Sequence, residues 1–345
     1  MTETIRYAIV GLGNIGRNVL EVYANRQEQI KARYDLEFVL VGAADSSGAA
    51  MDPEGLDIAR IRDIKYTKGG VSEYPECGQE RVAALKMVQE VEAEILVDAS
   101  PTNLEDGEPG MSCVRTALHK GWHVVTSNKG PLVLAFGDLM DLSEEMGVEL
   151  LYCGTVAGGL PVINMGTRDL AGCGITRVEG IFNGTTNYIL TRMLEGEVSY
   201  EEALKGAQDA GIAEPDPTLD VDGWDAANKL VIVANGVLGR PTTLDDLKVE
   251  GIRDVTLEDL QQARERGQVI KPLASAIKRG EDYVLEAGPM AIDEDHPLAH
   301  TGQWDMGVVY YTDFMGVISA VIEARGPVPT SAAVLRDMIN IYDHP

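Results

Sequence analysis

The N-terminal stretch IRYAIVGLGNIG, residues 5–16, carries the clearest indication of architecture in this chain. Its first half, Ile5–Val10, is a short apolar run that ends at a glycine, which is typical of a buried parallel strand. Its second half, Gly11–Gly16, matches the pattern GxGxxG and opens a segment with helical spacing. The first glycine of this pattern permits a tight turn, the second lets the backbone approach a pyrophosphate, and the third lets the helix pack closely on the strand. The stretch therefore predicts a dinucleotide-binding unit with the diphosphate at the helix N-terminus.

The other predicted cofactor contacts follow the ends of later strands, because ligands of open α/β sheets bind at the carboxyl edge. Asp45 ends the second strand, where its carboxylate can accept hydrogen bonds from the adenosine ribose. Ser100 follows another strand, and the turn TSNKGP, residues 126–131, lies between a strand and a helix. The predicted contacts in these segments are Gly11, Gly13, Asn14, Ile15, Gly16, Asp45, Ser46, Ser100, Asn128 and Lys129.

Asp45 also bears on the form of the cofactor. An acid at this position without an adjacent arginine favours NAD over NADP, and the next residues are two serines and a glycine. The spacing from the glycine loop exceeds the usual value of about 20 residues, so we expect an extended first helix or loop. NADP stays open, because Arg60, Arg62, Lys65 and Lys68 could fold back toward a 2′-phosphate.

Strand-like and helix-like segments alternate through the first half of the chain, which indicates βαβ units and a parallel sheet. The predicted fold class is α/β: a Rossmann-type, doubly wound parallel sheet followed by a second, α+β domain for substrate binding and dimerisation. We expect a dinucleotide-binding domain at 1–152 and the second domain at 153–328, with a C-terminal helix within 329–345 packing back on the first domain. Helices are expected at 15–34, 79–91 and 111–120, and Pro329, Thr330 and Ser331 are expected to cap the last helix.

Composition narrows the classes of function. The net charge is −26, with 55 acidic and 29 basic residues, and such a surface repels nucleic acid. No run of 18 apolar residues is present, so we expect no membrane span. The four cysteines are scattered, which fits a reducing cytoplasm better than a disulfide framework or a zinc site. The acidity has two interpretations, adaptation to high salt or an ordinary acidic cytoplasmic enzyme.

The segment AQDAGIAEPDPTLDVDGWDAANK, residues 207–229, suggests proton-transfer chemistry. Asp225 and Lys229 are four residues apart, so on a helix they share a face and can touch. A lysine beside a carboxylate is a plausible acid–base group, whereas a solvated helical ion pair is the alternative. Lys129 likewise either points at the cofactor or lies in solvent. Cys153 could suggest a nucleophile, but a small core cysteine is the better interpretation.

Taken together, the motifs GLGNIG, TSNKG, GTVAGGLPV, IFNGTTNYIL and AGIAEPDPTLDVDGWDAANK resemble homoserine dehydrogenases over nearly the whole chain. The segment TDFMGVISAVI, from Thr312, is more similar to archaeal-type members. The resemblance implies the NAD(P)-dependent interconversion of L-homoserine and L-aspartate 4-semialdehyde, a step toward threonine and methionine. It also implies a homodimer, and we expect no C-terminal regulatory domain.

The resemblance further implies roles for individual residues. The implied catalytic residues are Lys229, Asp225 and Lys129, and the implied substrate-binding residues are Glu214, Gly184 and Thr185. A structural sodium ion would be held, largely through backbone carbonyls, by Cys153, Val156, Gly158 and Leu160.

Two departures from the family pattern affect these roles. Cys153 stands where the family usually has a glutamate. The family's GPGAG segment is missing, and only Gly326 of it survives as a cofactor contact. Two alternatives therefore stay open: a dehydrogenase of the same build acting on another small hydroxy acid or amino alcohol, and a nucleotide-binding sensor without catalysis.

Overall fold

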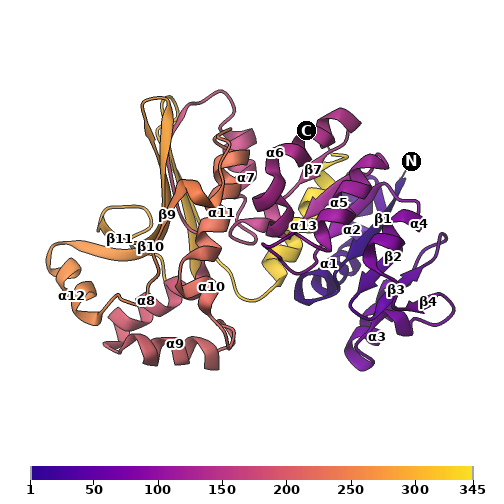
Figure 1. The fold of residues 1–345 in the computed structure, drawn as a ribbon, viewed down its shortest axis with the longest axis horizontal. Coiled ribbons are helices and arrows are strands. Elements are labelled where there is room, and N and C mark those ends of the chain that lie inside the picture. Colours follow the sequence, from indigo (N-terminus) through magenta and orange to yellow (C-terminus); the bar gives the residue numbers. More distant parts are fainter. Residues whose placement is uncertain (1, 344–345) are drawn as a thin grey trace. The chain divides into compact units, whose positions relative to one another are not determined.

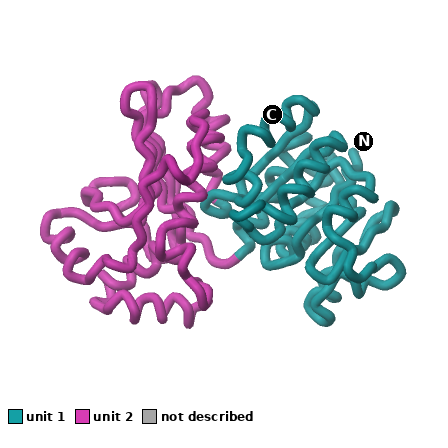
Figure 2. Tube along the Cα trace, viewed as in Figure 1, with its two compact units in different colours: residues 1–159, 327–345 teal, residues 160–326 magenta. Residues whose placement is uncertain are grey.

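The computed structural model describes residues 2–343, which fold into two compact units (Figure 2). Unit 1 comprises Met1–Gly159 and Pro327–Pro345, and unit 2 comprises Leu160–Gly326. Unit 1 is thus built from two separate segments of the sequence. The assignment of cofactor binding to one domain and substrate binding to the other remains a proposal.

Unit 1 contains a seven-stranded sheet in the order β4-β3-β2-β1-β5-β6-β7 (Figure 1). The five strands from β2 to β7 in this order are parallel, with β1 next to both β2 and β5. This arrangement, with its crossover from β2 to β5, is the Rossmann-type order, so the predicted fold class is confirmed. The strands are β1 Glu3–Val10, β2 Leu36–Asp45, β3 Gly48–Met51, β4 Gly78–Glu80, β5 Ile95–Asp98, β6 His123–Thr126 and β7 Leu150–Leu151.

Two segments of unit 1 differ from the sequence-based expectation. The predicted helix over 79–91 begins as strand β4, and only Ala84–Glu90 forms a helix, α4. β4 extends the sheet by pairing antiparallel with β3, which itself pairs antiparallel with β2. The predicted helix over 15–34 is two helices, α1 Asn14–Ala24 and α2 Gln27–Tyr34. The remaining helices of five or more residues in the first segment are α3 Ile58–Thr67, α5 Gly110–His119 and α6 Lys129–Met146.

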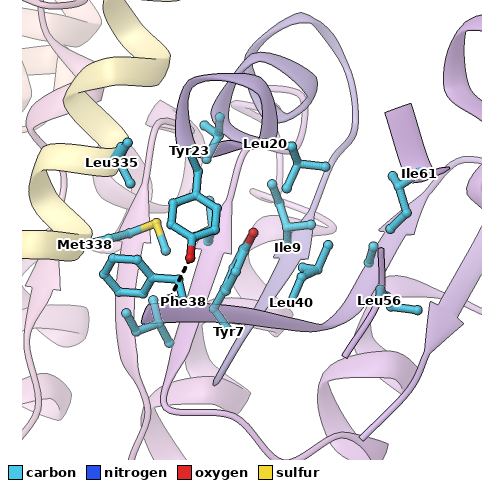
Figure 3. Close-up of a cluster of buried hydrophobic side chains, with 14 of the residues drawn as sticks. Tyr7, Ile9, Leu20, Tyr23, Phe38, Leu40, Leu56, Ile61, Leu335 and Met338 are labelled. Carbon is cyan, nitrogen blue, oxygen red and sulfur yellow. Dashed lines mark hydrogen bonds between the residues drawn. The ribbon is translucent and has the colours of Figure 1, made fainter. Parts of the chain in front are cut away.

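The C-terminal helix α13, Val328–Asn340, belongs to the core of unit 1. Leu335 and Met338 pack in the same apolar cluster as Tyr23 and Phe38, whose rings meet edge-on (Figure 3). The predicted capping of this helix by its own Ser331 is wrong. The helix begins earlier, at Val328, and the Ser331 hydroxyl lies near the carbonyls of Ile15 and Pro327, at 3.0 and 3.1 Å, instead of capping the helix.

Unit 2 contains a six-stranded sheet in the order β13-β12-β8-β10-β11-β9. The helices α8 and α11 both pack against β10 of this sheet. The strands are β8 Ile175–Ile181, β9 Leu247–Val249, β10 Gln268–Arg279, β11 Asp282–Asp293, β12 Asp305–Thr312 and β13 Val317–Glu323. The helices are α7 Val162–Asn164, α8 Gly184–Gly196, α9 Tyr200–Asp209, α10 Thr218–Val221, α11 Trp224–Gly236 and α12 Leu257–Glu265. In the described part of the chain, no helix combines the length and apolarity that crossing a membrane requires.

Candidate active site

The glycine loop joins β1 to α1 through backbone that only glycine tolerates. Gly11 has a φ of +90°, and a Cβ atom there would lie 2.3 Å from the carbonyl oxygen of Ala99. A Cβ atom on Gly16 would lie 1.9 Å from the Gly11 carbonyl oxygen, so this glycine lets α1 approach the strand. A Cβ atom on Gly13, by contrast, would meet nothing within 4 Å. The loop therefore keeps open space at the N-terminus of α1, where amide groups favour a diphosphate.

A cavity of about 780 Å³ lies along this loop at the carboxyl edge of the sheet. Seven of the predicted cofactor contacts line it: Gly11, Gly13, Asn14, Ile15, Asp45, Ser46 and Ser100. Lys65 and the segment 81–84 also line it. The sequence analysis missed 81–84 because it assigned these residues to a helix. Arg81 lies instead just after β4, with a φ of +58° and its amide bonded to the Ser47 carbonyl. The lining residues fit a bound dinucleotide.

Asp45 ends β2 inside this cavity, and four protein donors already contact its carboxylate. One oxygen accepts from the amide and the hydroxyl of Ser47, at 2.8 and 2.6 Å. The other accepts from the Lys65 ammonium and from the Val71 amide. Burial raises the pKa of Asp45, but the bonds from Lys65, Ser47 and Val71 outweigh it and hold the pKa below its ordinary value. The carboxylate is therefore ionised at neutral pH and paired with Lys65.

Asn128 and Lys129 occupy the turn between β6 and α6. Neither residue is among the described residues that line the cavity. Asn128 is only 1% exposed and caps α6, since its side-chain oxygen accepts from the Gly130 amide at 2.9 Å. Its side-chain nitrogen contacts the hydroxyl of Ser100, which does line the cavity, at 3.1 Å. Lys129 is the first residue of α6.

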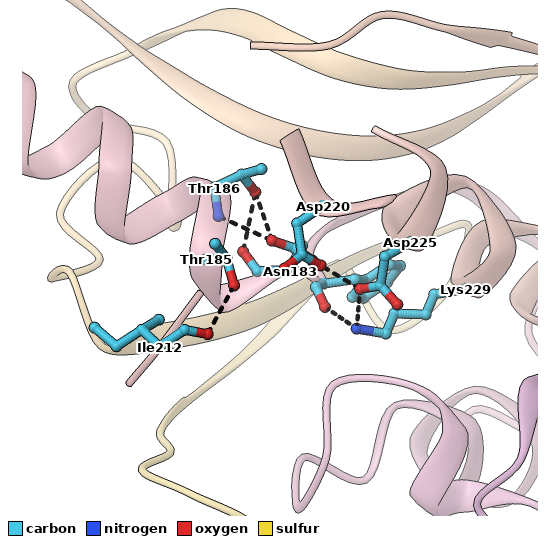
Figure 4. A network of polar contacts seen from close by, with 8 residues as sticks. Asn183, Thr185, Thr186, Ile212, Asp220, Asp225 and Lys229 are labelled. Atoms are coloured by element: carbon cyan, nitrogen blue, oxygen red, sulfur yellow. Dashed lines mark hydrogen bonds and ion pairs between the residues drawn. The ribbon is translucent and has the colours of Figure 1, made fainter. Parts of the chain in front are cut away.

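A second polar cluster lies in unit 2, around the N-termini of α8 and α11 (Figure 4). The Lys229 ammonium donates to the Asp225 carboxylate and to the Phe182 carbonyl, both at 2.6 Å. The Lys229 and Asp225 side chains are 13% and 15% exposed. The lysine therefore does not face bulk water, and the interpretation as a solvated surface pair is wrong.

Asn183 and Asp220 complete this cluster, and the sequence analysis gave neither a role. The Asn183 side-chain nitrogen donates to Asp220 at 2.6 Å and to Asp225 at 2.8 Å, while its oxygen caps α8 at the Thr186 amide. Burial, and then the charge of Asp225, raises the pKa of Asp220. Asp220 was one of several acids in a continuous run, and nothing local distinguishes it from its neighbours. The signal that could have indicated Asn183 is its position immediately before a helix.

The other predicted site residues lie at the start of α8 or in loops. Gly184 and Thr185 begin α8, and the Thr185 hydroxyl contacts the Ile212 carbonyl at 3.4 Å. Glu214 lies exposed in the loop between α9 and α10. Gly326, at a φ of +69°, lies between β13 and α13.

The predicted sodium ligands lie around the segment 153–160. Cys153, Val156 and Gly158 are in unit 1 and Leu160 is in unit 2. The amide of Cys153 donates to the buried carboxylate of Asp337 on α13, at 2.9 Å. Within residues 2–343, no three His, Cys, Asp or Glu side chains are grouped to hold a metal ion. That observation does not test carbonyl ligands, so the sodium site stays a prediction.

Comparisons with known proteins identify the family of this chain. The family model described as homoserine dehydrogenase matches residues 161–339, and that described as glutamate/leucine/phenylalanine/valine dehydrogenase matches residues 1–106. A homoserine dehydrogenase of Methanocaldococcus jannaschii is 39% identical over 97% of this chain and 98% of its own length. An NAD(+)-dependent homoserine dehydrogenase of Pseudomonas canavaninivorans is 36% identical over 99% of this chain and 97% of its own length.

Solved structures give the same result. A putative homoserine dehydrogenase from Archaeoglobus fulgidus superposes with a TM-score of 0.88, at 37% identity, covering 99% of this chain and 100% of its own. A hyperthermophilic archaeal homoserine dehydrogenase mutant in complex with NADPH has a TM-score of 0.84, at 26% identity, with 98% of both chains covered.

The fold, the cavity and these relatives together define an oxidoreductase that uses NAD or NADP. The matches over nearly the full chain identify it further: this chain belongs to the homoserine dehydrogenase family. The two alternative functions, another substrate or loss of catalysis, are not favoured.

Proposed function

We propose that this enzyme interconverts L-homoserine and L-aspartate 4-semialdehyde, with Lys229 as the proton-transfer group. The main support is the 2.6 Å contact between the Lys229 ammonium and the Asp225 carboxylate, whose side chains are both largely buried. A bound nicotinamide would supply the hydride acceptor for the alcohol carbon of homoserine, or the hydride donor for the aldehyde carbon in the reverse direction. The cofactor belongs to the cavity in unit 1, and the cluster around α8 and α11 in unit 2 supplies acid–base and substrate groups.

The geometry of Lys229 suits a proton transfer to oxygen. An ammonium group has three N–H donors, and the contacts to Asp225 and Phe182 use two of them. We assign the third to the substrate oxygen. In the reducing direction, this N–H gives its proton to the oxygen as the aldehyde becomes an alcohol. In the oxidising direction, the neutral amine accepts the hydroxyl proton. Asp225 holds the amine in place in both directions.

Two acids are assigned to the substrate ammonium. Glu214 is exposed in its loop, where its carboxylate can make a charge-assisted hydrogen bond to an amino group. Asp220 lies beside Asp225, joined to it by the amide of Asn183. We further assign the backbone at Gly184 and the Thr185 hydroxyl to the substrate side of this cluster. Lys129 is assigned to the nicotinamide side.

The decisive experiment is replacement of Lys229 by alanine. We expect turnover to fall by about a hundredfold or more, because a positioned acid–base group is lost, while the affinity for cofactor changes little. Lys205→Ala is the matched control, since Lys205 forms an i,i+4 pair with Asp209 at 3.0 Å on the exposed side of α9. Turnover of the Lys229 variant at the level of the control would remove Lys229 from the mechanism.

We also propose that NAD is the preferred cofactor and that Lys65 keeps NADP binding possible. Asp45 is ionised and would repel a 2′-phosphate, but Lys65 neutralises it and itself carries a suitable charge. Lys65 also occupies the carboxylate oxygen that a ribose hydroxyl would need. Its replacement should therefore weaken the binding of NADPH without weakening the binding of NADH.

Lys65→Met tests the cofactor proposal. We expect the Kd of NADPH to rise about tenfold, from loss of one charge-assisted bond, and the Kd of NADH to stay constant or fall. Lys86→Met, which removes an exposed lysine of α4, is the control. Equal changes for both cofactors in the Lys65 variant would contradict the proposal. Nicotinamide fluorescence provides the measurement.

Three further properties are proposals that follow from the family. We propose a homodimer formed by unit 2, in which β13 is an edge strand with Val317 and Val321 about half exposed. Light scattering should then give twice the chain mass of 37.2 kDa; a single chain mass would reject the dimer.

The other two proposals are a cytoplasmic location and a bound structural sodium ion. A melting temperature that rises with sodium but not with potassium would support a bound sodium ion.

A further inference from the structure

The carboxyl end of β5 carries a buried acid that the proton-transfer cluster does not use. Asp98 has no exposed surface, and its carboxylate accepts four hydrogen bonds. The amide and hydroxyl of Ser100 donate to one oxygen at 3.0 and 2.6 Å. The hydroxyl of Thr126 and the side-chain nitrogen of Asn128 donate to the other, both at 3.3 Å. Burying a carboxylate is unfavourable unless such bonds compensate for the lost water.

These bonds fix the orientation of the Asn128 amide. Its nitrogen points to Asp98 and to the Ser100 hydroxyl, so its oxygen is left to accept from the Gly130 amide. That last bond caps α6, the helix that Lys129 begins. Asp98 thereby determines the orientation of the Asn128 side chain that caps α6.

Two glycines show how closely other elements approach this network. A Cβ atom on Gly110, the first residue of α5, would lie 2.4 Å from the Asn128 side-chain nitrogen and 2.9 Å from an Asp98 oxygen. A Cβ atom on Gly11 would lie 2.6 Å from the Ser100 amide nitrogen. The glycine loop, the start of α5 and the start of α6 therefore all meet around the turn that Asp98 holds.

We propose that Asp98 is a positioning residue for the dehydrogenase reaction, which acts through Asn128 and Ser100 to hold the start of α6 and the adjoining wall of the cofactor cavity. Part of this inference rests on the proposed role of Lys129. Burial raises the pKa of Asp98, against the bonds from Ser100, Asn128 and Thr126. Four directed hydrogen bonds suit Asp98 to fixing the positions of Ser100, Thr126 and Asn128.

Asp98→Asn tests the inference with little change of shape. The new side-chain amide has one NH2 group, which opposes a donor in either orientation. If it faces Asn128, that side chain must turn and its bond to Gly130 is lost; if it faces Ser100, the bond from the Ser100 amide is lost. We expect kcat with homoserine to fall at least tenfold and the KM for cofactor to change less than kcat. Asp138→Asn, on the exposed face of α6, should leave both constants unchanged.

The double variant Asp98→Asn with Asn128→Asp separates positioning from general stability. It restores a donor opposite an acceptor, and the second oxygen of the carboxylate introduced at position 128 can still cap α6. We expect it to recover at least half of the lost kcat on a logarithmic scale. A melting temperature that recovers while kcat does not would overturn the inference, as would a kcat of Asp98→Asn within twofold of the wild type.

Gly110→Ala provides an independent variant if Asp98→Asn fails to fold. It keeps every side chain of the network but forces the new methyl group against Asn128, so kcat should again fall at least tenfold. Unchanged kcat in this folded variant would also reject the inference. NADH binding by fluorescence is measured alongside. If the wild type binds NADH but does not oxidise homoserine, the proposed function fails; if only the Asp98 and Gly110 variants behave like the wild type, this inference alone fails.

Discussion

Three lysines of this enzyme are largely withdrawn from water, and their partners differ. Lys65 and Lys229 each contact a carboxylate, Asp45 and Asp225. Lys271 on β10 is 4% exposed and instead donates to the Thr301 carbonyl at 2.7 Å. Paired lysines are suited to binding and proton transfer, whereas Lys271 carries the cost of burial with a neutral group as its nearest acceptor.

This difference predicts how stability depends on pH. Burial lowers the pKa of Lys271 from 10.5 to about 8, although the charges of Glu195 and Asp305 oppose the shift. Between those two values the unfolded chain binds a proton that the folded chain does not, so the contribution of Lys271 to stability rises with pH in this window. From pH 7 to pH 10.5 the wild type should gain about 3 kcal/mol relative to Lys271→Met. Urea unfolding of both proteins at the two pH values measures it, and a constant difference would contradict it.

Glu214 provides a second test at the level of one side chain. Glu214→Leu should raise the KM for homoserine about tenfold or more, since one charge-assisted bond to the substrate ammonium is lost. The KM for cofactor should not change. Glu201→Leu, on the exposed face of α9, is a suitable control. An unaltered KM for homoserine would leave ammonium binding to Asp220 alone.

At the scale of elements, the start of α8 combines a helix cap with the proton-transfer cluster. Asn183 caps the helix through its oxygen and holds Asp220 and Asp225 through its nitrogen. Local stability and the geometry beside Lys229 therefore depend on the same amide.

Asn183→Ala should accordingly cost more than the loss of an ordinary cap. An N-cap contributes about 1 kcal/mol, and two partly buried carboxylates that lose their donor add about 1–2 kcal/mol more. Thr256→Ala removes the exposed cap of α12 and should cost only the first amount. Unfolding free energies from urea titration compare the two, and equal losses would show that the carboxylates do not depend on Asn183.

The sequence predicted those elements whose signals are local. β1, the glycine loop and α1 follow from an apolar run, a glycine pattern and helical spacing within 24 residues. The β3–β4 extension was missed because β4 is stabilised by pairing with a strand about 30 residues away. The start of α13 was misassigned because Pro329, which was expected to precede the helix, lies within its first turn. Among the acids of 214–225, only the fold distinguishes Asp220, since its contact with Asn183 spans 37 residues.

At the scale of the whole molecule, the dominant feature is charge. The net charge of −26 on 345 residues means that folding brings many like charges together. Several acids are compensated locally, as Asp45 is by Lys65, but most of the excess is not.

Salt should therefore stabilise the protein if the acidity is an adaptation to high salt. Raising KCl from 0.1 to 1 M shortens the screening length from about 10 to about 3 Å, which weakens repulsion between surface carboxylates. We expect the melting temperature to rise across this range. A melting temperature that does not increase with salt would favour the ordinary acidic enzyme.

The position of α13 in unit 1 also has a consequence for biosynthesis. The ribosome completes all of residues 160–326 before it reaches this helix, yet Val334, Leu335 and Met338 fill the interior beside β1 and β2. During translation, unit 2 is a continuous stretch that can acquire its structure first. The first segment of unit 1 is synthesised earlier, but the core of unit 1 lacks these apolar side chains until α13 leaves the ribosome.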